Sequence, residues 1–208
     1  MFNSGFKPTK FDGSEKVFAA PKNMGLPKEF SYKKYLPSVL DQGQDPICVP
    51  CSLSTHINYQ LNLKDGKKVD NKVDLFSIYE SKSSYGEGMQ FGEAFDYLQK
   101  KGVKTKQGNF KIGEPLVVRS AQTLKFALMV NGPCVGALPV YDASGRDEFW
   151  NPKNGREIIG YHAIAIVGYN EKGFIIRNSW GTSYGEDGYA FLPNEHINLF
   201  IEIWTIAK

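Results

Sequence analysis

Apolar residues recur with a helical period through most of the first half of the chain. Between residues 47 and 64 the spacing of Leu53, Ile57 and Leu61 predicts an amphipathic helix with one buried face, and Gly66 ends it. The same pattern predicts helices over residues 74–81 and 90–101, and a further one between a capping Ser120 and Gly132.

After residue 132 the pattern changes to short apolar runs that are typical of strands. These runs are Cys134–Val140, His162–Tyr169, Phe174–Arg177, Gly188–Leu192 and Leu199–Ile206. Helices in the first half and strands in the second predict an α+β arrangement with segregated elements. Residues 1–25 show no clear period, and we expect an extended arm there.

Composition narrows the class of protein. The 208 residues are 41% apolar and 23% charged, which is typical of a soluble globular protein, and a net charge of +3 is too small to indicate nucleic-acid binding. No apolar run approaches the ~20 residues that span a bilayer, and the first ten residues lack the apolar block of a signal peptide. Three cysteines do not make a disulfide framework. We expect a monomer with no nucleic-acid or membrane partner, in the cytoplasm or associated with a virus.

Candidate chemistry begins with one histidine. His162 stands at the start of an apolar run, and Asn178 follows the next run 16 residues later (178 − 162). A strand–turn–strand hairpin would bring the two side chains together. An imidazole held by an amide carbonyl is the orienting half of a nucleophilic triad, so a nucleophile should exist elsewhere in the chain.

Four segments in order resemble the papain family of cysteine peptidases. They are Gln42-Gly43, a cysteine at a helix start, Gly160-Tyr161-His162-Ala163 and Asn178-Ser179-Trp180-Gly181. The resemblance runs from about Leu26 to the C-terminus. It implies a two-lobed papain-like fold with a cleft between a helical lobe at 26–112 and a strand-rich, barrel-like lobe at 113–208, preceded by the arm at 1–25. It also implies an endopeptidase that acts on polypeptides and needs neither cofactor nor metal.

Two cysteines compete for the role of nucleophile. In the family the oxyanion-hole glutamine precedes the nucleophile by six positions, which matches Gln42 to Cys48 (48 − 42), whereas Cys51 lies nine positions on. Pro50 would suit the first position of a helix that begins there and so favours Cys51, but the end of a first turn also tolerates it. We assign Cys48. The resemblance is imperfect here, because Pro46 and its neighbours replace small residues and the distance to His162 is shorter than usual.

The resemblance then implies a role for each site residue. His162 takes the thiol proton, Asn178 orients the ring, Trp180 covers their hydrogen bond, and the Gln42 amide with the Cys48 N–H binds the oxyanion. Gly88 would pair with the substrate backbone. Three residues would line a pocket for an apolar side chain: Met89, Ala137 and Ala163.

Other interpretations stay open at this point. Cys48 and Cys51 form a C-x-x-C pair that suits redox or zinc chemistry, although no second Cys or His pair completes a metal set. The altered neighbourhood of Cys48 also fits an inactive homologue that binds peptides, and the same fold carries peptide ligases. Residues 1–25 or a protein inhibitor could hold the activity in check.

Overall fold

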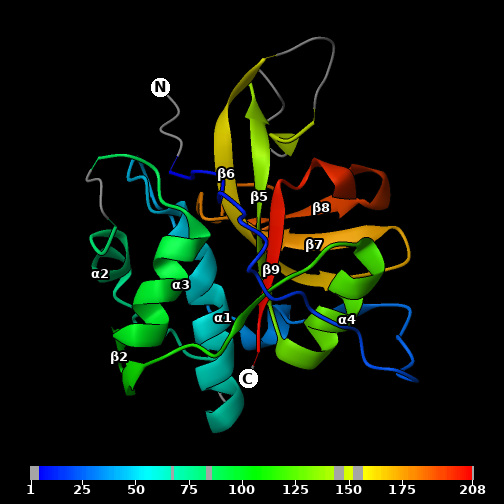
Figure 1. Ribbon diagram of the computed structural model, residues 1–208, viewed down its shortest axis with the longest axis horizontal. Coiled ribbons are helices and arrows are strands. Elements are labelled where there is room, and N and C mark those ends of the chain that lie inside the picture. The colour runs from blue at the N-terminus through cyan, green and yellow to red at the C-terminus, as the bar shows by residue number, and fades with distance from the viewer. Residues whose placement is uncertain (1–4, 67, 83–85, 143–147, 152–156, 208) are drawn as a thin grey trace.

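The computed structural model describes residues 5–66, 68–82, 86–142, 148–151 and 157–207, and it has the predicted α+β architecture (Figure 1). Helices α1, α2 and α3 lie on one side, and an antiparallel sheet with helix α4 lies on the other. Within the described residues no helix has the length and apolar character that crossing a membrane requires. The boundary proposed between residues 112 and 113 stays a prediction.

Helix α1 (Cys48–Asp65) is the long predicted helix. Leu53 and Ile57 are fully buried, which accounts for the four-residue period, and Gly66 ends the helix in the left-handed conformation at φ 61°. Helix α3 (Phe91–Lys100) and helix α4 (Ala121–Asn131) also lie where they were predicted, each behind a capping box. Helix α2 (Leu75–Tyr79) is shorter than predicted.

The main sheet has seven strands in the order β4-β9-β5-β6-β7-β8, with β1 paired to β6. Five of them contain or overlap the predicted runs: β5 (Cys134–Tyr141), β6 (Ile158–Tyr169), β7 (Gly173–Arg177), β8 (Tyr189–Pro193) and β9 (Glu202–Ile206). The run predicted from Leu199 begins too early, because η3 (Asn194–Leu199) is a 3-10 helix. Four strands were missed: β1 (Phe30–Ser31), β2 (Val103–Thr105), β3 (Gly108–Phe110) and β4 (Pro115–Val117). At two or three residues they are too short to show alternation.

Strand β6 is the central strand, because β5 pairs with it on one side and β7 on the other. The two faces of the sheet enter different apolar clusters. Ala163 joins the cluster of α1, α2 and α3, whereas Ile164 and Ile166 join the cluster under α4. The start of α1 and the middle of β6 therefore meet at the interface between the helices and the sheet.

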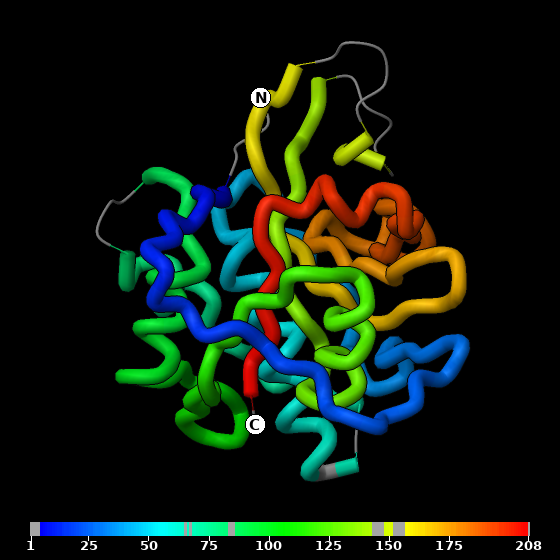
Figure 2. The backbone as a smooth tube through the Cα atoms, turned by 45° about the vertical axis from the view of Figure 1, so that its right-hand side comes forward, coloured from blue at the N-terminus to red at the C-terminus, as the bar shows by residue number. Residues whose placement is uncertain are grey.

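The N-terminal arm is extended, as predicted, and its described part begins at Gly5; residues 1–4 lie outside the described residues. The arm crosses the front of the molecule from the helices to the α4 side (Figure 2). Isolated parallel bridges join Phe6 to Met89 and Val17 to Val117. Phe18 is buried in the sheet-side cluster. The arm is thus docked on both halves of the molecule.

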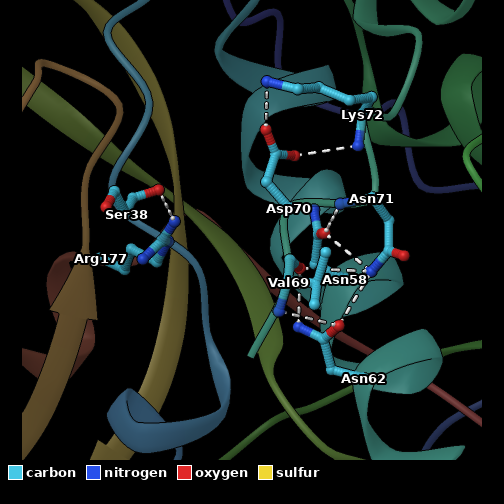
Figure 3. Close-up of polar contacts among 8 residues, drawn as sticks. All are labelled: Ser38, Asn58, Asn62, Val69, Asp70, Asn71, Lys72 and Arg177. Atoms are coloured by element: carbon cyan, nitrogen blue, oxygen red, sulfur yellow. Dashed lines mark hydrogen bonds and ion pairs between the residues drawn. The ribbon is translucent and has the colours of Figure 1, made fainter. Parts of the chain in front are cut away.

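Three asparagines fasten the loop after α1 to the helix itself (Figure 3). The Asn58 side-chain carbonyl accepts from both the backbone and the side-chain N–H groups of Asn71, at 2.8 and 3.2 Å. Asn71 Nδ2 also donates to Asn62 Oδ1 at 3.0 Å, and Gln107 Nε2 donates to Asn71 Oδ1 at 2.9 Å. All three cysteines of the chain are free thiols, so hydrogen bonds, not a disulfide, hold this loop.

Candidate active site

His162 and Asn178 lie side by side across the β6–β7 hairpin. The imidazole Nε2 donates to the Asn178 Oδ1 at 2.7 Å, and the two residues are 1% and 4% exposed. The pairing of Ala165 with Arg177 sets this arrangement. His162 precedes Ala165 in β6, and Asn178 directly follows Arg177, the last residue of β7. The hairpin geometry therefore brings together the two residues that the sequence singled out.

Two aromatic rings cover this hydrogen bond. Trp180 stacks on the His162 ring with centroids 4.7 Å apart, and Phe149 meets the same ring edge-on at 5.4 Å. Phe149 also contacts Trp180 at 5.0 Å. Phe149 could not be predicted as a site residue, because it lies outside every periodic run. Together the rings keep water from the imidazole and hold its plane.

Cys48 is the first residue of α1 and is fully buried. The backbone of Ala163, which directly follows His162, contacts its thiol and lowers the thiol pKa, as do the backbones of Val49 and Cys48 itself. Burial outweighs these contacts and raises the pKa of Cys48 to about 12. Because α1 begins at Cys48, Pro50 is the third helical residue, where its missing N–H disturbs no helix bond.

The other two thiols lie elsewhere. Cys51 lines a small internal cavity together with Ser52, Thr55 and Asn178. Cys134 is buried at the start of β5. Burial raises the pKa of both thiols. Among the three thiols, Cys48 is the one whose pKa the backbone of Ala163, the residue beside His162, lowers.

Gln42 reaches the site from the loop before α1. Its backbone N–H donates to the Ser179 carbonyl at 2.8 Å, and its side-chain Nε2 donates to the Asp45 carbonyl at 2.8 Å. The Ser179 hydroxyl donates to Gln42 Oε1 at 2.5 Å. These bonds fix the Gln42 amide between the start of α1 and the segment that carries Asn178.

Arg177 holds the beginning of the same loop. Its guanidinium donates to the carbonyls of Pro37 and Ser38 at 2.9 and 2.8 Å, the second of which is visible in Figure 3, and to the Tyr189 hydroxyl at 2.7 Å. Arg177 is the last residue of β7, so the sheet anchors the loop that leads to Gln42. The sequence analysis did not single out Arg177.

The residues predicted to bind substrate either contact the arm or share an apolar cluster with it. Met89, Ala137 and Ala163 are buried in one cluster with Phe6, which is 3% exposed. The backbone groups that pair with the arm belong to Met89 rather than to Gly88: its N–H donates to the Gly5 carbonyl, and its carbonyl accepts from the Lys7 N–H, both at 3.0 Å. Gly88 permits the approach, because a Cβ there would lie 3.0 Å from the Phe6 backbone.

The protonation of the site follows from this covering. Burial lowers the pKa of His162 to about 4, against an opposing contribution from the Asn178 hydrogen bond. Because the pKa of the Cys48 thiol is raised to about 12 and that of the His162 imidazole is lowered to about 4, both groups are neutral at pH 7. Among the described residues no group of three or more His, Cys, Asp or Glu side chains could hold a metal ion.

Comparisons with known proteins agree with this geometry. Residues 111–200 match the family described as papain family cysteine protease. An uncharacterized peptidase C1-like protein of Acanthamoeba polyphaga mimivirus is 42% identical over 62 residues, which cover 27% of this chain and 20% of the viral protein. Procathepsin L of Felis catus is 26% identical over 220 residues, covering 88% of this chain and 65% of the relative. The chain thus spans less than two thirds of the length of either relative.

The fold is similar to solved structures over nearly the whole chain. Xylellain, a cysteine protease from Xylella fastidiosa, superposes with a TM-score of 0.83 at 23% identity, covering 99% of this chain and 96% of that one. This likeness identifies the fold. The chain therefore has a papain-like fold, and its residues 111–200 match the papain family cysteine protease model.

Proposed function

We propose that the chain is a cysteine endopeptidase that hydrolyses peptide bonds through a Cys48–His162–Asn178 triad. The observation that carries this proposal is the 2.7 Å hydrogen bond from His162 to Asn178 under two aromatic rings, with the Cys48 thiol against the residue that follows His162. An oriented imidazole beside a thiol at a helix N-terminus is the arrangement that activates sulfur as a nucleophile.

In this proposal each step is assigned to one group of the site. The Nδ1 nitrogen of His162 accepts the Cys48 thiol proton, since Nε2 is committed to Asn178. The thiolate attacks the scissile carbonyl and forms a thioacyl-enzyme, while the imidazolium gives its proton to the leaving amine. Water then attacks the acyl group with His162 as general base, which restores the thiol.

Gln42 supplies the oxyanion donor in this mechanism. One of the two N–H groups of its side-chain amide donates to the Asp45 carbonyl. The Ser179 hydroxyl donates to the oxygen of the same amide and so fixes its orientation. The second N–H, together with the Cys48 backbone N–H, serves the oxyanion. Fixed donors of this kind contribute about 3–4 kcal/mol of transition-state stabilisation each.

The arm regulates this site in our proposal. Its backbone takes both hydrogen-bonding groups of Met89, and Phe6 is buried in the apolar cluster that contains Met89, Ala137 and Ala163. Gly5 passes so close to Pro46 that a Cβ there would lie 2.7 Å from its backbone. A polypeptide substrate needs the same groups, so the docked arm inhibits the enzyme and its release activates it.

The test compares Cys48→Ala with Cys51→Ala on a library of fluorogenic peptides. Cys48→Ala should abolish cleavage and Cys51→Ala should retain it. A thiol-directed epoxide peptide should label Cys48 in the parent chain and lose that label in His162→Ala. Labelling without turnover would indicate a peptide-binding homologue, and product transfer to an added amine would indicate a ligase.

A further inference from the structure

A second buried thiol stands one helical turn from the nucleophile. Cys51 follows Cys48 in α1 with only Val49 and Pro50 between them, and it is 4% exposed. No step of the proposed peptide hydrolysis uses it. Cys134, the third thiol, belongs to strand β5 and shares no element with them.

The start of a helix is the one place where such a pair can close into a disulfide. Side chains three residues apart lie on the same helix face with Cβ atoms about 5–6 Å apart, and a disulfide needs about 3.5–4.5 Å. The first turn must therefore tighten by about 1–2 Å. First-turn N–H groups have no intrahelical acceptor, and Pro50 has no N–H at all. Tightening the first turn would therefore mainly disturb one backbone hydrogen bond of α1. This is the bond from the Cys51 N–H to the Ile47 carbonyl, which is 2.9 Å long.

Cys51 lies beside a small internal cavity. Ser52, Thr55 and Asn178 also line this cavity. After burial, the charge of Cys48 is the largest contribution that raises the pKa of Cys51, which places the two sulfurs within electrostatic reach of each other. Ile47, the residue that precedes α1, makes no side-chain capping hydrogen bond that would hold the turn in one geometry.

We propose that Cys51 is the resolving thiol for Cys48, so that the two form a reversible disulfide which switches the peptidase off and protects its nucleophile. This inference rests on the proposed function in which Cys48 is the nucleophile. It assigns the C-x-x-C pair a redox role that operates alongside peptide hydrolysis.

The chemistry requires a hydroperoxide as the oxidant. The Cys48 thiolate attacks the terminal peroxide oxygen, the O–O bond breaks, and the alkoxide takes a proton and leaves as an alcohol, or as water from hydrogen peroxide. Cys48 is then a sulfenic acid. The Cys51 sulfur attacks the Cys48 sulfur, the S–O bond breaks, and hydroxide leaves with the Cys51 proton as water. Two thiols have lost two electrons and two protons, and the peroxide has gained them.

The experiment oxidises the full chain with hydrogen peroxide, followed by trypsin without reductant and mass spectrometry. One tryptic peptide, Tyr35–Lys64, contains both Cys48 and Cys51 and excludes Cys134. We expect this peptide to lose the mass of two hydrogens, with activity lost in parallel and both restored by dithiothreitol. The mass reports the disulfide whether or not the reduced chain cleaves peptides, so failure of the proposed function would be seen separately.

Three variants complete the design. Cys51→Ser should retain peptidase activity, but its Cys48 should proceed to sulfinic acid and activity should not return with dithiothreitol. Cys134→Ser should behave as the parent. Phe6→Ala loosens the arm above Cys48, so peroxide reaches the thiol even if the docked arm blocks it in the parent. A Tyr35–Lys64 peptide that gains oxygen without losing hydrogens in both the parent and Phe6→Ala would overturn the inference, as would a disulfide that includes Cys134.

Discussion

The hydroxyl of Ser179 donates to the side-chain carbonyl of Gln42 at 2.5 Å, and this bond joins the two ends of the site. The backbone N–H of Ser179 also donates to Asn178 Oδ1 at 2.7 Å, the same oxygen that accepts from His162. One residue thereby holds both the amide that orients the imidazole and the amide that serves the oxyanion.

Ser179→Ala should therefore weaken oxyanion stabilisation while leaving substrate binding intact. A hydrogen bond of this kind contributes about 1–1.5 kcal/mol, so kcat should fall about five- to tenfold with KM nearly unchanged. Ser54→Ala is the matched control, because this buried serine donates to the Cys51 carbonyl inside α1 and makes no contact with Gln42. In a Gln42→Ala background the Ser179 substitution should add no further loss. A rise in KM at constant kcat would contradict this role.

Release of the arm gives a second prediction. Phe6→Ala removes a buried ring from the cluster of Met89, Ala137 and Ala163 and should raise peptidase activity of the full chain about tenfold or more, since truncating a buried Phe typically costs about 3–5 kcal/mol. Val17→Ala is the control, because its side chain is 48% exposed and its contact with Val117 is a backbone bridge. Activity against a small fluorogenic peptide is the measurement. Equal activity of Phe6→Ala and the parent would rule out inhibition by the arm.

The lowered pKa of His162 makes stability depend on pH. The unfolded chain takes up a proton at the ordinary histidine pKa of 6.5, whereas the buried ring resists protonation until about pH 4. Between these values the unfolded state binds more protons, so the free energy of unfolding should decrease as pH falls from 6.5 to 4, by up to about 3 kcal/mol. Urea unfolding at pH 7 and at pH 5 checks this. His162→Gln should reduce the loss of unfolding free energy between pH 7 and pH 5, whereas His196→Gln should leave that loss unchanged. The same pH dependence in His162→Gln as in the parent would refute the role given to His162.

Elements long enough to show a hydrophobic period could be predicted from the sequence. The four-residue period of Leu53, Ile57 and Leu61 located α1, and Asn178 with His162 located the hairpin that forms the site. Short strands such as β1 and β4 were invisible, because two or three residues carry no period and their pairing with β6 and β9 is set by tertiary structure.

The missed site features have the same origin. Phe149 and Arg177 act through contacts with residues distant in sequence, Phe149 lies outside every periodic run, and the predicted strand that ends at Arg177 does not reveal the partners of its guanidinium. The substrate-binding residues stay a prediction, and the backbone pairing between Met89 and the arm was not predicted. That pairing depends on the strand direction of a segment without any period, so only coordinates could assign it.

The asparagine cluster beside α1 gives the last prediction. Asn71→Ala removes one donor each from Asn58 and Asn62 and the acceptor of Gln107, so three hydrogen bonds are lost. We expect the free energy of unfolding to fall by about 2–3 kcal/mol, measured by urea denaturation, because each hydrogen bond contributes about 1 kcal/mol.

The adjacent residue supplies the control for this prediction. Lys72 forms an ion pair with Asp70 at 2.7 Å, next to the cluster in Figure 3, and both side chains are exposed, at 69% and 37%. Lys72→Ala should change the free energy of unfolding by less than about 0.5 kcal/mol, because exposed ion pairs contribute little. Similar losses for Asn71→Ala and Lys72→Ala would show that the loop is held by charge. A loss confined to Asn71→Ala would show that buried amides fasten it, and thereby fix the helix whose first residue is Cys48.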